Sequence, residues 1–217
     1  MESLLVIDDS QRSTFYYYCS TNEKNILIRL LPETTSKKNE HLGKQFSSLN
    51  RLEFIEWFSS EFGLQVKTYI VITKEKLLKI IMEELSQNGV VTISNPYEFT
   101  QEGFDFKRGK QKVTLEELEI FFTCYPDSSE HFAIFSRQEH VLRLYKQKIQ
   151  AKKNPILLVK KFNQLKKSVD TNLTLTGVTR EVGELFKIGG RRLTKLDLPK
   201  NNFFETKAEI LRLITKQ

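Results

Sequence analysis

The chain has 217 residues, of which 39% are hydrophobic, and its 16 Phe and 7 Tyr supply ample apolar material for one sizeable core. Its longest apolar runs fall far short of the roughly 20 residues that span a bilayer, and no signal-peptide pattern opens the sequence. We therefore expect a soluble chain. Because no linker rich in Pro, Gly or Ser divides it, we also expect a single domain over residues 1–217.

The net charge of +7 is unevenly placed along the sequence. Residues 1–142 carry 16 basic and 21 acidic side chains, whereas residues 143–217 carry 18 basic and 6 acidic ones. This asymmetry favours an anionic partner, such as phosphate groups, an acidic polymer or a membrane surface. The alternative is that the Lys-rich faces of the C-terminal helices are simply solvated.

The first third of the chain alternates short apolar runs with polar turns. The Ser/Lys/Asn-rich residues 34–44 predict a mobile loop. Asn50 as N-cap with Glu53 three residues later, and Gly63 as the stop, predict a helix. Runs of β-branched, aromatic and aliphatic residues predict strands at residues 4–7, 15–20, 26–31 and 68–72.

The next segment combines a helical pattern with strand-like runs. Thr73 starts a second predicted helix, whose apolar residues fall on one face before Asn88-Gly89 ends it. Residues 90–93 read as a strand. Residues 105–109, with the Lys/Gln/Lys run after them, suggest a hairpin-like excursion from that strand.

The rest of the chain is mainly helical in pattern. Thr114 with Glu117 forms a capping box for a short turn of helix, which we expect to pass into a strand over residues 120–125. Because strands and helices are interleaved, the sequence predicts a three-layer α/β/α sandwich with a mixed central β-sheet. The remaining predicted elements are helices at residues 136–150, 155–169 and 176–188, a strand at 192–196 and a terminal helix from residue 205.

Several chemical classes lack their minimum signatures. The chain has no dinucleotide-binding glycine motif, no Walker loop, no zincin motif and no nucleophile elbow. We interpret His41, His131 and His140 as solvated side chains. Cys19 and Cys124 have no metal-ligand spacing, and we interpret them as small buried hydrophobes. The basic C-terminal third offers nucleic acid only a non-specific electrostatic attraction, so we expect no sequence-specific nucleic-acid partner.

The order of short motifs along the chain resembles the LytR-CpsA-Psr (LCP) family. The family's enzymes move a glycopolymer from a polyprenyl-pyrophosphate carrier onto the cell wall, and they hold the pyrophosphate with arginines and a magnesium ion. The resemblance spans residues 4–198 and implies an LCP-like fold. The segments that carry it are Leu4–Asp9, Arg12-Ser13-Thr14, Arg29–Thr34, Val90–Phe99, Arg137-Gln138 and Asp170–Leu173.

Only four of the family's site positions match in this chain. The resemblance makes Asp9 a candidate remnant of the metal site, and it makes Arg12, Arg137 and Gln138 candidate phosphate-binding or ligand-binding residues. Losing one arginine contact to a phosphate typically lowers the rate by about two to three decades. The site positions that depart from the family's charged residues are Thr14, Glu33, Thr34, Phe122, Cys124 and Ile134.

The intact element order beside these departures predicts a catalytically inactive LCP-like domain. We expect it to be a binding or scaffolding module in cell-envelope glycopolymer assembly, without a cofactor, although active relatives use Mg²⁺. Its expected partners are envelope proteins, an anionic glycopolymer or a polyprenyl phosphate lipid. The resemblance implies an extracytoplasmic location, with a membrane anchor outside this chain.

Two alternatives remain open at this point. One is a working phosphotransferase with an atypical site that uses Arg12, Arg137 and the basic C-terminal third. The other is a polyprenyl-lipid-binding protein whose tunnel is lined by apolar residues such as Leu77, Ile81, Leu158 and Phe162, although ordinary core packing is the favoured explanation of that stripe.

Overall fold

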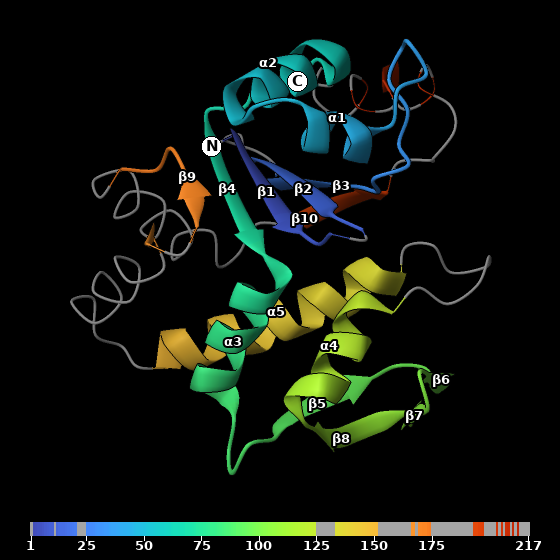
Figure 1. Ribbon diagram of the computed structural model, residues 1–217, viewed down its shortest axis with the longest axis vertical. Coiled ribbons are helices and arrows are strands. Elements are labelled where there is room, and N and C mark those ends of the chain that lie inside the picture. The colour runs from blue at the N-terminus through green and yellow to red at the C-terminus, as the bar shows by residue number, and fades with distance from the viewer. Residues whose placement is uncertain are drawn as a thin grey trace. The chain divides into compact units, whose positions relative to one another are not determined.

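The computed structural model describes residues 2–10, 12–20, 25–124, 133–151, 166–167, 169–174 and 193–197, together with residues 203, 205, 207, 208, 210 and 212. The chain forms two compact units (Figure 1). The first unit comprises Met1–Thr73 and Phe162–Gln217, and the second comprises Lys74–Lys161. The expected single domain over residues 1–217 stays a prediction.

A mixed six-stranded sheet forms the centre of the first unit, with strand order β10-β3-β2-β1-β4-β9. β1 pairs with β4, and β3 with β10, in parallel, whereas the other neighbours are antiparallel. The mixed sheet confirms the α/β class and its predicted strands, while the two-residue strand β9 had no sequence signal. The strands are β1 (Glu2–Asp8), β2 (Thr14–Ser20), β3 (Asn25–Leu30), β4 (Thr68–Thr73), β9 (Asp170–Thr171) and β10 (Leu193–Asp197).

Helices α1 (Leu42–Ser48) and α2 (Arg51–Phe62) cover one face of this sheet (Figure 1). Aromatic side chains join the two layers: the ring of Phe15 in β2 lies 5.5 Å from that of Phe46 in α1 and 6.0 Å from that of Phe54 in α2. Burying such rings removes large apolar surfaces from water and so stabilises this unit.

Local signals set the ends of α2 as the sequence predicts. Asn50 and Glu53 form a reciprocal capping box at its start. Gly63 ends it in the left-handed conformation, with φ of 68°, which glycine adopts without steric strain.

The prediction of a loop over residues 34–44 is wrong at its end. α1 begins at Leu42 because Leu42 and Phe46, four residues apart, both reach the apolar core.

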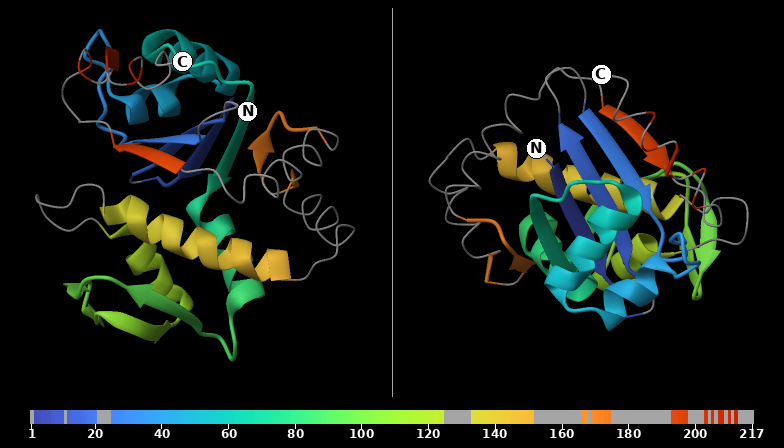
Figure 2. Two further views of the ribbon diagram at one scale, coloured as in Figure 1. Left: turned by 180° about the vertical axis from the view of Figure 1, so that it is seen from behind. Right: turned by 90° about the horizontal axis from the view of Figure 1, so that it is seen from above.

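The second unit contains three helices and two short β-ribbons. β5 (Val91–Asn95) pairs antiparallel with β8 (Gly109–Val113), and β6 (Phe99–Gln101) pairs with β7 (Phe104–Phe106), which gives the predicted hairpin-like excursion. The helices are α3 (Lys74–Leu85), α4 (Leu115–Thr123) and α5 (Ala133–Ala151). α5 packs across both α3 and α4 (Figure 2).

The strand predicted over residues 120–125 is wrong for the described part of that range. The Thr114–Glu117 capping box starts α4, and the helix continues to Thr123. A continuous apolar run fits a buried strand and a buried helix equally well, and its length does not separate them. The segment is helical because helical spacing buries Leu118, Phe121 and Phe122 together.

Several sequence predictions fall near or outside the edges of the described residues. The helix expected at 136–150 is confirmed as α5, which begins three residues earlier. The described residues between 203 and 212 are helical, as predicted from residue 205. The helix predicted at 176–188 lies outside the described residues, as does nearly all of the one at 155–169. Among the described helices, none combines the length and apolarity needed to cross a membrane.

Candidate functional site

The turn between β1 and β2 carries the first group of predicted site residues. Ser13 shapes this turn: its hydroxyl accepts a hydrogen bond from the Asp9 N–H at 3.2 Å and donates to a carboxylate oxygen of Asp8 at 3.0 Å. Asp9 and Arg12 therefore lie in a turn held by the serine between them. Sequence analysis did not assign a role to Ser13 or Asp8, although Ser and Asp close together are typical of such turns.

An ion pair joins Arg12 to Glu33. Nη2 of Arg12 contacts Oε1 of Glu33, which follows Pro32 in the turn after β3. The two side chains are 27% and 37% exposed, so the pair is only partly screened by solvent. Glu33, which stands where the family resemblance implies an arginine, thus neutralises the guanidinium that was expected to bind a phosphate.

Thr14 and Thr34 occupy the two positions at which the family resemblance implies aspartates. Both are fully buried. Thr14 opens β2 opposite Ile7 of β1, and Thr34 takes part in the turn after β3, where its N–H donates to Leu31 O at 3.0 Å. Both side chains are therefore packed away from solvent, and neither offers a charged oxygen to a ligand.

These residues do not supply the oxygen cluster that Mg²⁺ binding requires. Asp8 and Asp9 lie on the same turn, but among the described residues no group of three or more His, Cys, Asp or Glu side chains is placed to hold a metal ion. The side chains present in this unit thus do not fit the metal site of the family's enzymes. The expectation that the chain has no cofactor stays a prediction.

Arg137 lies in the first turns of α5 and is 6% exposed. Its Nε donates to the carbonyl oxygen of Phe121 at 2.8 Å, and its Nη2 donates to that of Cys124. These carbonyls belong to the end of α4, where no further turn of helix can satisfy them. A cation at a helix C-terminus also interacts favourably with the helix dipole. Arg137 thus caps α4.

The neighbouring Gln138 makes a similar contact. It is 2% exposed, and its Nε2 donates to the carbonyl oxygen of Phe122 at 3.4 Å. The guanidinium of Arg137 also lies 5.2 Å from the ring centre of Phe99 in β6 and 6.0 Å from that of Phe121, within the range of a cation–π interaction. The Arg-Gln pair therefore links α5, α4 and the β6–β7 ribbon.

The three apolar departures surround this cap. Phe122, Cys124 and Ile134 are buried, with exposed fractions of 0%, 5% and 2%. Burial raises the pKa of the Cys124 thiol, although the Arg137 cation acts in the opposite direction. Because the thiolate is the reactive form, this cysteine is a poor nucleophile. Cys124 and Cys19 are both free and buried, as the sequence suggested.

The prediction that His140 is a solvated side chain is wrong. His140 lies on α5 and is half-buried, and its Nε2 accepts a hydrogen bond from the Ser94 N–H of β5 at 2.9 Å. Its Nδ1 lies 3.1 Å from the Arg143 guanidinium. Burial first, and the Arg143 charge second, lower the pKa of His140. His41 is exposed, as predicted, and His131 lies outside the described residues.

The residues suggested for a lipid tunnel divide between the interior and the undescribed part of the chain. Leu77 and Ile81 of α3 are buried, with exposed fractions of 8% and 0%. Leu158 and Phe162 lie outside the described residues. The two described side chains are buried, as ordinary core packing requires.

The predicted site residues fall into two groups, one in each unit. The first unit brings Asp9, Arg12 and Glu33 to neighbouring turns, with Thr14 and Thr34 buried beside them. The second unit brings Arg137 and Gln138 to the end of α4. In both groups the described cations already contact an oxygen of the same unit.

Known structures share this fold. TagV from B. subtilis matches with a TM-score of 0.70 at 12% identity over 100% of this chain and 98% of its own. A LytR-Csp2A-Psr enzyme from Actinomyces oris matches with a TM-score of 0.71 at 14% identity over 97% and 88%. A transcriptional regulator from Enterococcus faecalis matches with a TM-score of 0.70 at 13% identity over 99% and 87%.

These likenesses confirm the LCP-like fold that the motif order predicts. At such low identities they concern the fold alone. No protein-family model matches the sequence. No curated protein matches it by sequence comparison either.

Proposed function

We propose that this chain is a non-catalytic LCP-like module that binds or scaffolds components of cell-envelope glycopolymer assembly. The observation that carries the proposal is the ion pair between Arg12 and Glu33. It places a carboxylate on the one predicted cation of the first unit. The LCP-like fold supports the link to the cell envelope, and the altered site residues support the absence of catalysis.

Electrostatics explain why this pair opposes phosphoryl transfer. A pyrophosphate carries several negative charges, and its transfer needs cations placed to meet charge that develops in the transition state. Glu33 would repel that charge, although solvent partly screens its carboxylate, which is 37% exposed. Thr14 and Thr34, buried where aspartates are expected, would not offset this repulsion with a metal ion.

The charge distribution supports an anionic partner. Residues 143–217 carry 18 basic and 6 acidic side chains, an excess suited to an anionic wall glycopolymer. We place the module at the extracytoplasmic face of the membrane, in contact with envelope proteins or with such a polymer. Binding of this kind needs no catalytic centre.

A transfer assay tests the absence of catalysis. The purified chain is incubated with a glycopolymer on a polyprenyl-pyrophosphate carrier and with peptidoglycan, beside a catalytically active LCP enzyme as positive control. We expect no transfer by the wild-type chain. Transfer above the no-enzyme background overturns the proposal. The Glu33→Arg variant, which restores the cation of the family pattern, shows whether the repelling charge alone blocks the reaction.

A binding assay tests the scaffolding part separately. We expect the purified chain to co-sediment with an anionic wall glycopolymer at low salt and to be released as the salt concentration rises, because screening weakens contacts between exposed charges. A neutral polysaccharide of similar length serves as the control. Equal sedimentation with both polymers, or with neither, removes the support for an anionic-polymer partner.

A further inference from the structure

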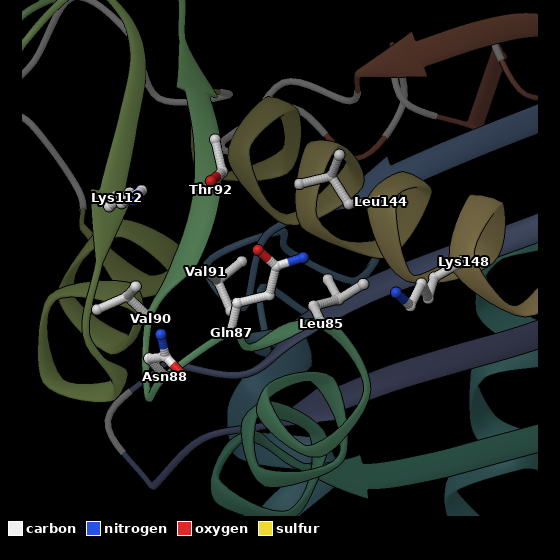
Figure 3. Close-up of a pocket in the computed structure, with 9 residues that line it drawn as sticks. All are labelled: Leu85, Gln87, Asn88, Val90, Val91, Thr92, Lys112, Leu144 and Lys148. Carbon is white, nitrogen blue, oxygen red and sulfur yellow. The ribbon is translucent and has the colours of Figure 1, made fainter.

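A cavity of about 380 Å³ lies in the second unit where α3 gives way to β5 (Figure 3). A tight turn creates this corner: Gln87 and Val90 exchange backbone hydrogen bonds of 2.9 and 3.2 Å across Asn88 and Gly89. Both turn residues have positive φ, 54° and 79°, as a two-residue hairpin of this type requires. The chain reverses sharply there, and α3, β5 and α5 enclose the space beside the turn.

The inner wall of the cavity is apolar. Leu85 from the end of α3, Val91 from β5 and Leu144 from α5 line it. Val91 is 2% exposed, while the two leucines are half-buried. The volume is at the lower end of the range for small-molecule sites, which is about 300 to 1,000 Å³. The space therefore suits a small molecule with an apolar body.

The rim of the cavity is cationic. Lys112 comes from β8 and Lys148 from α5, and no acidic residue is among the described residues that line the cavity. Within the described residues neither lysine forms an ion pair, and the side-chain amides of Gln87 and Asn88 make no hydrogen bond. Figure 3 shows the Gln87 amide between Val91 and Leu144. Two ammonium groups and two amides are thus left to meet an anionic head group.

We propose that this cavity binds a small organic anion that carries an apolar group. The lysines would contact the charged head, the amides would donate hydrogen bonds to it, and the apolar wall would cover the body. The site is separate in its residues from the predicted phosphate-binding positions, because none of Arg12, Arg137 and Gln138 lines it. It therefore does not depend on the function proposed above.

Octanoate and octyl phosphate are suitable probes, because they share the apolar chain and differ in the head group. Each is titrated into the full ¹⁵N-labelled chain, with octanol and inorganic phosphate as controls that lack one half of the ligand. We expect saturable shifts of the Gln87–Thr92 amides with at least one of the two anions. Octanol and phosphate should bind more weakly by about tenfold or more, because each makes only part of the contacts.

Paired lysine variants separate this site from general charge attraction. Lys112→Gln with Lys148→Gln removes the two rim cations, whereas Lys110→Gln with Lys146→Gln removes two exposed cations from the same elements outside the cavity lining. Both double variants change the net charge equally. We expect the first to weaken binding by about fivefold to tenfold, as two partly screened ion pairs would, and the second to leave it within about twofold.

The same titrations contain the outcomes that overturn the proposal. An equal loss of affinity in both double variants means that the attraction is merely electrostatic. Octanol binding as tightly as the anions means that the cations have no role. Failure of both anions to give saturable shifts rejects the site. Binding of only one anion retains the site and identifies its head group as carboxylate or phosphate.

Discussion

The Arg12 turn in the first unit and the Arg137 cap on α4 in the second unit show that the same residue type can have two different roles. The sequence assigns both arginines the same phosphate-binding role. Arg12 is 27% exposed and contacts a carboxylate, so it keeps access to solvent and to other partners. Arg137 is 6% exposed and donates to two helix carbonyls, so a ligand can reach it only if α4 loses its cap. What surrounds a guanidinium therefore decides its role.

The largest effect should come from Arg137→Ala. The variant leaves the carbonyls of Phe121 and Cys124 without their donor and removes the ring contacts, so we expect a loss of about 3 kcal/mol in the free energy of unfolding. Urea denaturation followed by circular dichroism measures it. Lys146→Ala, an exposed change on the same helix, is the control and should change stability by less than about 0.5 kcal/mol.

Hydrogen exchange sharpens the same prediction. We expect amides near the end of α4 to lose protection in Arg137→Ala before amides in the first unit do, because the cap acts locally. If Arg137→Ala and Lys146→Ala unfold at the same urea concentration, Arg137 is not a cap, and the contrast with Arg12 fails.

The next largest effect concerns ligand binding at the Arg12 turn. Glu33→Gln removes the carboxylate that neutralises Arg12, so we expect inorganic pyrophosphate to bind about tenfold more tightly at low salt. Isothermal titration calorimetry measures the affinity. Glu40→Gln, in the segment that follows the same turn, changes the net charge equally and should have little effect. Identical affinities in the two variants would show that Glu33 does not restrict the turn.

The sequence predicted local elements of both units, but it did not predict the contacts of the two arginines. The Asn50–Glu53 capping box, the Gly63 stop and the strands β1 to β4 depend on neighbours along the chain, and each was predicted correctly. The partners of Arg12 and Arg137 were not predicted, because each contact joins residues 13 to 21 positions apart through tertiary packing. The helix over residues 120–123 was not predicted, because its apolar run fits both the helical and the strand periodicity.

A pH effect smaller than the loss expected for Arg137→Ala should come from His140. Burial and Arg143 lower the pKa of His140 below its ordinary 6.5, so the unfolded chain takes up this proton at a higher pH than the folded one. The contribution of neutral His140 to the free energy of unfolding is therefore complete above about pH 6.5. It decreases as the pH falls from there through the folded pKa, by up to about 1.4 kcal/mol per pH unit between the two values.

His140→Gln removes this titration, so its unfolding free energy should depend less steeply on pH below about 6.5 than that of the wild type. Urea denaturation at several pH values compares the two chains. Parallel curves would mean that burial and the Arg143 charge do not lower the pKa of His140 in the folded chain.

The smallest effect should come from Arg12→Gln. This variant tests whether Arg12, unlike Arg137, contributes little to the stability of the fold. A partly exposed ion pair stabilises a protein by about 0 to 1 kcal/mol, so we expect the free energy of unfolding to fall by no more than about 0.5 kcal/mol. A double-mutant cycle with Glu33→Gln isolates the coupling between the two charges. A loss as large as that expected for Arg137→Ala would make the Arg12 turn a structural element. The partly exposed Arg12–Glu33 pair would then be as fixed in its contacts as the buried Arg137 cap.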